Sequence, residues 1–168
     1  MRHANRWIMV LRNVLASAAT LAIVGIQPVI VQADDYDPVI VISMGDHFFE
    51  VPGSERDAPI KVKAGRVYFL QIRNNGKQEH NVEWGRDVLT KDGVPELYAT
   101  QLMGYVPVKI THKLWDVKVD GLRDLNMKPG EQIELEVIFP ESARGDWEIG
   151  CFRPGHYDGG MRLPFIVE

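Results

Sequence analysis

The sequence contains one cysteine, Cys151, among its 168 residues, so no disulfide can form within the chain. It contains no His-X-His pair, which excludes a catalytic cluster of several metal ions built from grouped histidines. It has no internal repeat and no apolar run of the ~20 residues that a membrane-spanning helix needs. What remains is ordinary for one globular domain, with 45% hydrophobic and 25% charged residues.

The N-terminal segment has no acidic residue before position 34, but it contains three arginines and then an apolar run of 13 residues at 14–26. This order is typical of a signal peptide, and the residues before Asp34 predict cleavage after Ala33. An uncleaved membrane anchor is the less favoured alternative, because the run is too short to span hydrocarbon. We therefore expect a signal peptide at 1–33 and a domain at 34–168 that is periplasmic or otherwise exported.

The expected mature domain is acidic. Without the leader it has 16 basic and 23 acidic residues, a formal charge of −7. Nucleic acid is therefore not an expected partner, since binding it depends on basic residues that neutralise phosphates. No arginine pair precedes the apolar run and no cysteine lies near Ala33, so general secretory export is the expected route.

Short segments in which apolar and polar residues alternate dominate the rest of the chain, and Pro and Gly turns separate them. They predict strands at 38–44, 47–51, 60–63, 66–73, 79–84, 132–139, 146–151 and 161–167. No segment predicts a convincing amphipathic helix, so the expected fold class is all-β, an antiparallel β-sandwich.

The stretch around 85–125 is the least regular part of the sequence. Residues 97–103 fit one helical turn, whereas 106–111 and 114–119 fit strands. We expect an irregular insertion here that crosses between the two sheets.

One loop between two predicted strands concentrates the reactive side chains. The run Gly-Cys-Phe-Arg-Pro-Gly-His-Tyr-Asp-Gly-Gly-Met at 150–161 holds the thiol of Cys151, the imidazole of His156 and the thioether of Met161. Its Pro-Gly and Gly-Gly pairs allow two sharp turns, so the three side chains can converge on one point. A lone thiol in an exported protein is either a small buried apolar residue or a thiolate that a metal protects.

A metal site of this composition needs a second imidazole, and His80 on a remote predicted strand is the candidate. Two imidazoles and a thiolate in a trigonal arrangement, with a distant thioether, are the ligands of blue-copper electron-transfer sites. The sequence therefore indicates a single copper ion held by His80, Cys151, His156 and Met161.

The run from Cys151 to Met161 resembles the copper loop of the cupredoxins, the family that includes azurin, plastocyanin and rusticyanin. Residues 75–81 resemble the segment that carries the family's first histidine, and Pro-Gly-Glu at 129–131 resembles the turn before its late strands. The resemblance implies a Greek-key sandwich with one type 1 copper ion that cycles between the cupric and cuprous states.

The resemblance also assigns a supporting role to Asn81, which follows the first histidine. In the family this asparagine often hydrogen-bonds across to the copper loop and so supports the ligands from outside the metal's own shell. Phe152 has no hydroxyl beside the thiolate, so in this chain such a bond must use its backbone.

Other interpretations of the same residues remain open. A thiol hydrolase also pairs a cysteine with a histidine, but one tight turn leaves no room for substrate, and no orienting Asn or Asp is evident. Zinc prefers a further thiolate or a carboxylate to a thioether. Met161 has the alternative of a core position at the start of the last strand.

A second metal site is a further open question, because other sulfur and imidazole side chains remain outside the loop. We expect the methionines among them to fill the core and His112 to lie at the surface. The residues in question are Met44, His47, Met103, His112 and Met127.

A rigid sandwich that fixes a compromise copper geometry favours electron transfer, so we expect a redox shuttle and no enzymatic activity. The resemblance implies that His156 lies near the surface, ringed by Phe152, Pro154 and Tyr157. Redox protein partners are expected to dock there, with transient contact to membrane-bound respiratory proteins. The alternative function, suggested by the extra Met and His residues, is a periplasmic copper carrier or copper-resistance protein without a dedicated redox role.

Overall fold

Strands make up nearly all the regular structure of residues 39–168, the part of the chain described by the structure, which is a computed structural model. The signal peptide and cleavage site predicted at 1–33 lie outside these residues. One sheet has the order β2-β1-β4-β10-β7-β8 and consists of Phe49–Glu50, Val39–Met44, Val67–Asn74, Gln132–Ile138, Val108–His112 and Trp115–Val119. The other has the order β3-β12-β11-β5-β6 and consists of Ile60–Val62, Arg162–Val167, Gly145–Gly150, His80–Lys91 and Val94–Gln101, with β9 (Leu125–Met127) paired to β5.

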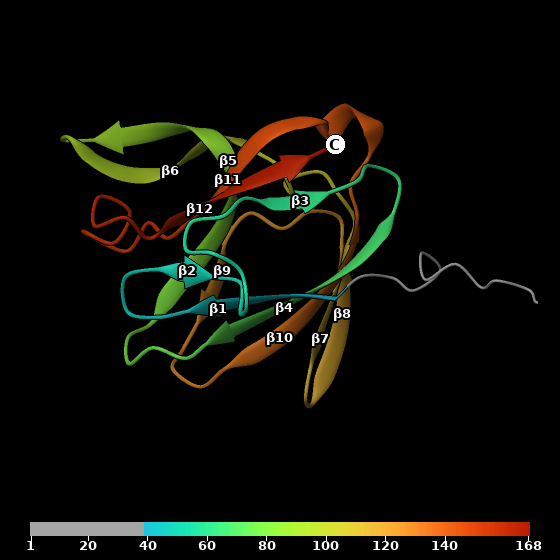
Figure 1. The fold of residues 1–168 in the computed structure, drawn as a ribbon, viewed down its shortest axis with the longest axis horizontal. Helices are drawn as coiled ribbons and strands as arrows, with labels where there is room; N and C mark the ends of the chain where they lie inside the picture. The colour runs from blue at the N-terminus through green and yellow to red at the C-terminus, as the bar shows by residue number, and fades with distance from the viewer. Residues whose placement is uncertain (1–38) are drawn as a thin grey trace, which may run out of the picture. The chain divides into compact units, whose positions relative to one another are not determined.

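The two sheets form the sandwich that the sequence predicts (Figure 1). Most neighbouring strands are antiparallel, but β1 runs parallel to β4 and β3 runs parallel to β12. A parallel pair cannot be closed by a tight hairpin, and the chain between β1 and β4 accordingly passes through β2 and β3 first. The sequence-distant neighbours β4, β10 and β7 show the crossing connections of a Greek-key arrangement.

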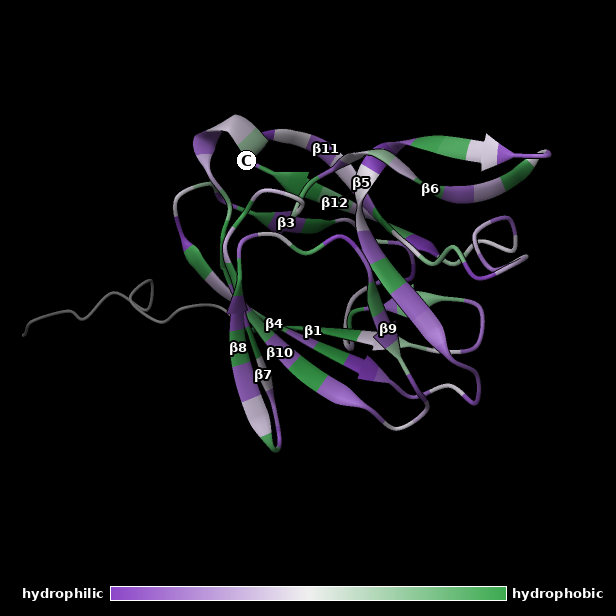
Figure 2. Cartoon of the chain, turned by 180° about the vertical axis from the view of Figure 1, so that it is seen from behind, coloured by the Kyte–Doolittle hydropathy of each residue, from purple (hydrophilic) through white to green (hydrophobic). Residues whose placement is uncertain are grey.

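Period-two alternation buries one face of each sheet. Buried positions alternate with exposed or half-buried ones along β4, β10 and β12, and Figure 2 shows green and purple bands alternating along the strands. The largest fully buried side chains are Trp84, Tyr98, Phe49, Phe139, Phe165, Ile42, Met44, Leu70, Ile72, Met103, Met127 and Leu135. The resulting core fixes the strand ends from which the predicted ligands project.

The 85–125 region is more regular than the sequence indicates. Strand β5 continues through Lys91 and returns as β6, and this hairpin projects past the rest of its sheet (Figure 1). The turn between them uses Asp92 and Gly93, both at positive φ, as a two-residue hairpin requires. The helical turn allowed at 97–103 is wrong, since residues 97–101 pair with β5, whereas the strands predicted at 106–111 and 114–119 are present as β7 and β8.

No helix within the described residues is long and apolar enough to cross a bilayer. Helical structure in this part of the chain consists of one 3-10 turn, Glu141–Ala143.

Candidate metal centre

The predicted ligands lie at the ends of three adjacent strands. His80 is the first residue of β5, Cys151 directly follows β11, and Met161 directly precedes β12. Strand β11 pairs antiparallel with both of the others, so the pairs Gly150 with Glu83 and Gly150 with Arg162 bring all three strand ends together. Residues far apart in the sequence therefore meet because of strand register.

The loop between β11 and β12 folds back through two turns, as its glycines predict. Gly155 and Gly160 both have positive φ, which L side chains rarely adopt. The backbone N–H of Met161 donates to the carbonyl of His156 at 2.9 Å, and that of Cys151 donates to the carbonyl of Met161 at 3.1 Å. These bonds fix the loop so that His156 turns inward over the ends of the strands.

The donor atoms of His80, Cys151 and His156 lie within 4.8 Å of one another. Cys151 Sγ lies 3.8 Å from Nδ1 of His80 and 3.5 Å from Nδ1 of His156, and the two Nδ1 atoms are 3.2 Å apart. Donors around one ion bound at about 2.0 Å to nitrogen and about 2.3 Å to sulfur stand about 3.2–3.8 Å apart. The three residues therefore fit a mononuclear metal ion without rearrangement.

Met161 completes the set by position. Its side chain is fully buried, as are those of His80 and Cys151, whereas His156 is 7% exposed. Its backbone is bonded to Cys151 and His156 by the two loop bonds, so a buried thioether residue adjoins the three donors in the fold. Two imidazoles, one thiolate and one thioether are the donor set of type 1 copper.

Burial sets the protonation states of the donors. Desolvation lowers the pKa of both His80 and His156, and each imidazole is therefore neutral at pH 7 with a lone pair to offer. Desolvation also raises the pKa of the Cys151 thiol. The thiol is thus protonated until a cation compensates the thiolate charge, and binding a metal releases one proton.

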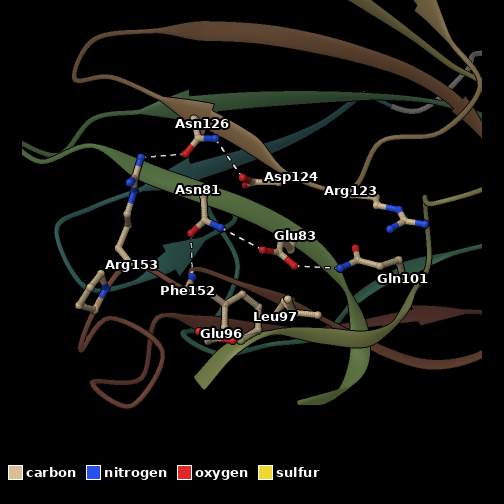
Figure 3. Close-up of a pocket in the computed structure, with 11 residues that line it drawn as sticks. Asn81, Glu83, Glu96, Leu97, Gln101, Arg123, Asp124, Asn126, Phe152 and Arg153 are labelled. Carbon is tan, nitrogen blue, oxygen red and sulfur yellow. Dashed lines mark hydrogen bonds between the residues drawn. The ribbon is translucent and has the colours of Figure 1, made fainter. Parts of the chain in front are cut away.

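Asn81 connects the loop to a polar network outside the site, as Figure 3 shows. Its Oδ1 accepts a hydrogen bond of 2.7 Å from the backbone N–H of Phe152, so the bond implied by the resemblance is present and uses the backbone. Its Nδ2 donates to Glu83 at 3.1 Å, and Glu83 also accepts from Gln101 at 2.9 Å. Both Asn81 and Glu83 are buried, so these bonds hold the residue after Cys151 in one position.

Residues of this network line a cleft of about 410 Å³ (Figure 3). It is lined by Asn81, Glu83, Glu96, Leu97, Gln101, Arg123, Asp124, Asn126, Phe152, Arg153 and Pro154. The cleft is bordered by Asn81 and by Phe152 and Pro154, which the resemblance places around His156, but by none of the four predicted ligands.

An aromatic cluster covers another side of the loop. Phe152 and Tyr157 stack at 4.9 Å, and Tyr98 of β6 meets Phe152 edge-on at 4.8 Å between ring centroids. The hydroxyls of Tyr98 and Tyr157 both donate to Oε1 of Glu148, at 2.8 and 2.5 Å. Burial is the main cause that raises the pKa of both tyrosines, so both hydroxyls remain protonated donors.

The structure also places residues whose roles the sequence left open. Met44, Met103 and Met127 are buried in the core, as expected. His112 stacks on Trp115 in the β7–β8 hairpin, with ring centroids 5.2 Å apart. His47 lies against the metal site, where its ring centroid is 5.1 Å from that of His156. No sequence signal distinguishes His47, because its proximity depends on how two separate turns pack.

No protein-family model matches the chain. The copper-resistant cuproprotein CopI of Pseudomonas aeruginosa is 24% identical over 152 residues, which cover 82% of this chain and 80% of CopI. Reduced rusticyanin superposes with a TM-score of 0.50 at 14% identity, covering 79% of this chain and 81% of its own. A multicopper oxidase from Campylobacter jejuni, described as a metallo-oxidase, superposes with a TM-score of 0.50 at 15% identity over 78% of this chain.

The chain corresponds to 30% of the length of that oxidase but to most of rusticyanin and CopI. These likenesses confirm the cupredoxin fold that the copper-loop resemblance implies.

Proposed function

We propose that the protein is an exported cupredoxin that binds one copper ion through His80, Cys151, His156 and Met161 and acts as an electron-transfer shuttle. The observation that carries this proposal is the preassembled buried triad, with donor separations of 3.2–3.8 Å. When bound, copper supplies the one-electron redox couple. The protein holds its ligands in place through strand ends and a loop fixed by hydrogen bonds, which reduces rearrangement on electron transfer.

The donor chemistry supports copper over zinc. Structural zinc sites use four thiolate or imidazole ligands, and catalytic zinc sites keep an open position for water. Here the fourth side chain is the fully buried thioether of Met161, a soft donor that suits copper.

Electrons would pass through His156, the one ligand of the four with any solvent exposure. The flat aromatic surface of Phe152 and Tyr157, each 9% exposed, adjoins it. We propose that redox partners dock over this surface, including membrane-bound respiratory proteins in transient contact, and that the protein itself is not an enzyme.

The visible absorption and paramagnetic-resonance spectra of the copper-loaded protein test this function. The unaltered protein is expected to show the intense thiolate-to-copper absorption, and Cys151→Ser is expected to abolish it because the thiolate is the donor of that transition. His112→Gln is the control, since His112 lies on β7 in the other sheet and stacks on Trp115. Retention of the band in Cys151→Ser would disprove the assignment.

A second candidate function is copper handling without a dedicated redox role. It is favoured by the similarity to CopI, a protein named for copper resistance, over most of both chains. Reversible reduction distinguishes the two candidates: a shuttle retains its metal through repeated reduction and reoxidation, whereas a carrier releases it. Loss of copper on the first reduction, followed by no recovery of the band, would favour the carrier.

A further inference from the structure

Two histidines of the described residues, His47 and His112, belong neither to the ligand set nor to the core, and of these His47 lies at the metal site. Its side chain is exposed, on the turn between β1 and β2, and its ring meets that of His156 edge-on with 68° between the ring planes. The donor group within 4.8 Å is formed by His80, Cys151 and His156, and His47 stands outside it.

The turn that carries His47 is hydrogen-bonded to the turn between β4 and β5, which precedes His80. The N–H of Gly45 donates to the carbonyl of Phe48 at 3.0 Å, and the ring of Phe48 occupies the space that a Cβ on Gly45 would need. The N–H of Lys77 donates to Oδ1 of Asp46 at 2.5 Å, and the N–H of Asn75 donates to the carbonyl of Met44 at 2.9 Å. Because both turns are tied together, the position of His47 beside His156 is a feature of the fold.

Among the four ligands, His156 is the one with exposed surface. His80, Cys151 and Met161 have no exposed surface, so an incoming ion must pass His156. His47 presents an imidazole at that point, and the adjacent Asp46 carries a carboxylate whose pKa is lowered further by the hydrogen bond from the Lys77 N–H. A fixed carboxylate and an imidazole together attract a copper ion and offer it a first donor.

We propose that His47 is a transient surface ligand that receives copper and passes it to His156 during loading of the buried site. This role rests on the proposed copper binding and adds a residue outside the permanent ligand set. Transfer requires only exchange of one imidazole donor for another, followed by loss of the Cys151 proton to solvent as the thiolate binds. No change in copper oxidation state is involved.

The rate of copper loading tests the proposal. The copper-free protein is mixed with cupric salt below saturation, and the growth of the thiolate-to-copper absorption is followed by stopped flow. His47→Gln is expected to load several times more slowly, because an incoming ion loses its first imidazole donor. Its final spectrum at saturating copper is expected to match that of the unaltered protein, because His47 is not a permanent ligand.

His112→Gln is the matched control, a histidine on β7 whose ring stacks on Trp115, and it is expected to load at the original rate. Asp46→Asn removes the carboxylate charge and is expected to slow loading. Added salt, which screens that charge, is expected to slow loading of the unaltered protein in the same way. Loading of His47→Gln at the original rate, or equal slowing in His112→Gln, would overturn the proposal, as would an altered final spectrum. Absence of the band in the unaltered protein would instead refute the copper site itself.

Discussion

Replacement of Asn81 by alanine measures how far the polar network outside the ligands stabilises the loop. The change removes two buried hydrogen bonds, one from the Phe152 N–H at 2.7 Å and one to Glu83 at 3.1 Å. The Phe152 N–H is left unpaired in a buried position, and Glu83, which keeps the bond from Gln101, loses one of its donors; each loss costs about 1–3 kcal/mol. We therefore expect Asn81→Ala to lower the free energy of unfolding by roughly 2–6 kcal/mol, a large share of the ~5–15 kcal/mol of a typical domain.

Urea unfolding of the copper-free protein is the appropriate assay, because bound metal would add its own stabilisation to the unaltered protein and to the variant. The midpoint is expected to fall while the slope with denaturant is unchanged, since the exposed surface on unfolding is nearly the same. Asn126→Ala is the matched control: Asn126 faces Asn81 in the β5–β9 register but is exposed, and its bonds run to Asp124 and Arg153.

We expect Asn126→Ala to change stability by less than about 0.5 kcal/mol, as is usual for exposed positions. A loss in Asn81→Ala no greater than that of the control would refute the reasoning. It would mean that water satisfies the Phe152 N–H as well as Asn81 does, and that the loop is held by its own turns alone.

Three further perturbations follow from the same geometry. Met161→Leu is expected to retain copper but raise the reduction potential measured by voltammetry, because a thioether donor is replaced by an apolar group; an unchanged potential and spectrum would show that Met161 is not a ligand. Burial raises the pKa of Glu83, so ionising it opposes folding. The unaltered protein should therefore lose stability relative to Glu83→Gln as pH rises from the ordinary carboxyl range to neutrality in urea unfolding, and a relative gain would contradict this. Copper at about 100 times its dissociation constant should stabilise the protein by about 2.7 kcal/mol in thermal unfolding, an effect that Cys151→Ser should largely remove; equal stabilisation of both would argue against ligation by the thiol.

The strands and the loop ligands could be predicted because both are encoded locally. Alternation marks β4 and β10 directly, and the spacing of Cys151, His156 and Met161 with two glycine turns defines three ligands within one segment. His80 could be assigned only by chemical need and family resemblance, because its contact with Cys151 depends on the register between β5 and β11.

What the sequence could not reveal depends on which surfaces meet. Glu83 alternates like an outward polar residue, yet it is buried, and there it accepts hydrogen bonds from Gln101 of β6 and from Asn81. Apart from the buried Tyr98, residues 97–101 are exposed or half-buried, so their hydrophobic pattern does not separate a strand from a helical turn until β5 pairs with them. The parallel pairing of β1 with β4 and of β3 with β12 could not be predicted either, since alternation does not encode the direction of a neighbouring strand.

The full burial of Cys151, the one thiol in the sequence, has a practical consequence for labelling chemistry. A cysteine introduced at Leu114, which is 82% exposed in the β7–β8 turn, would be the single site that a maleimide reaches in the folded protein. A fluorophore or an electrode could then be attached at one defined position, and the appearance of a second reactive thiol would report directly on opening of the fold.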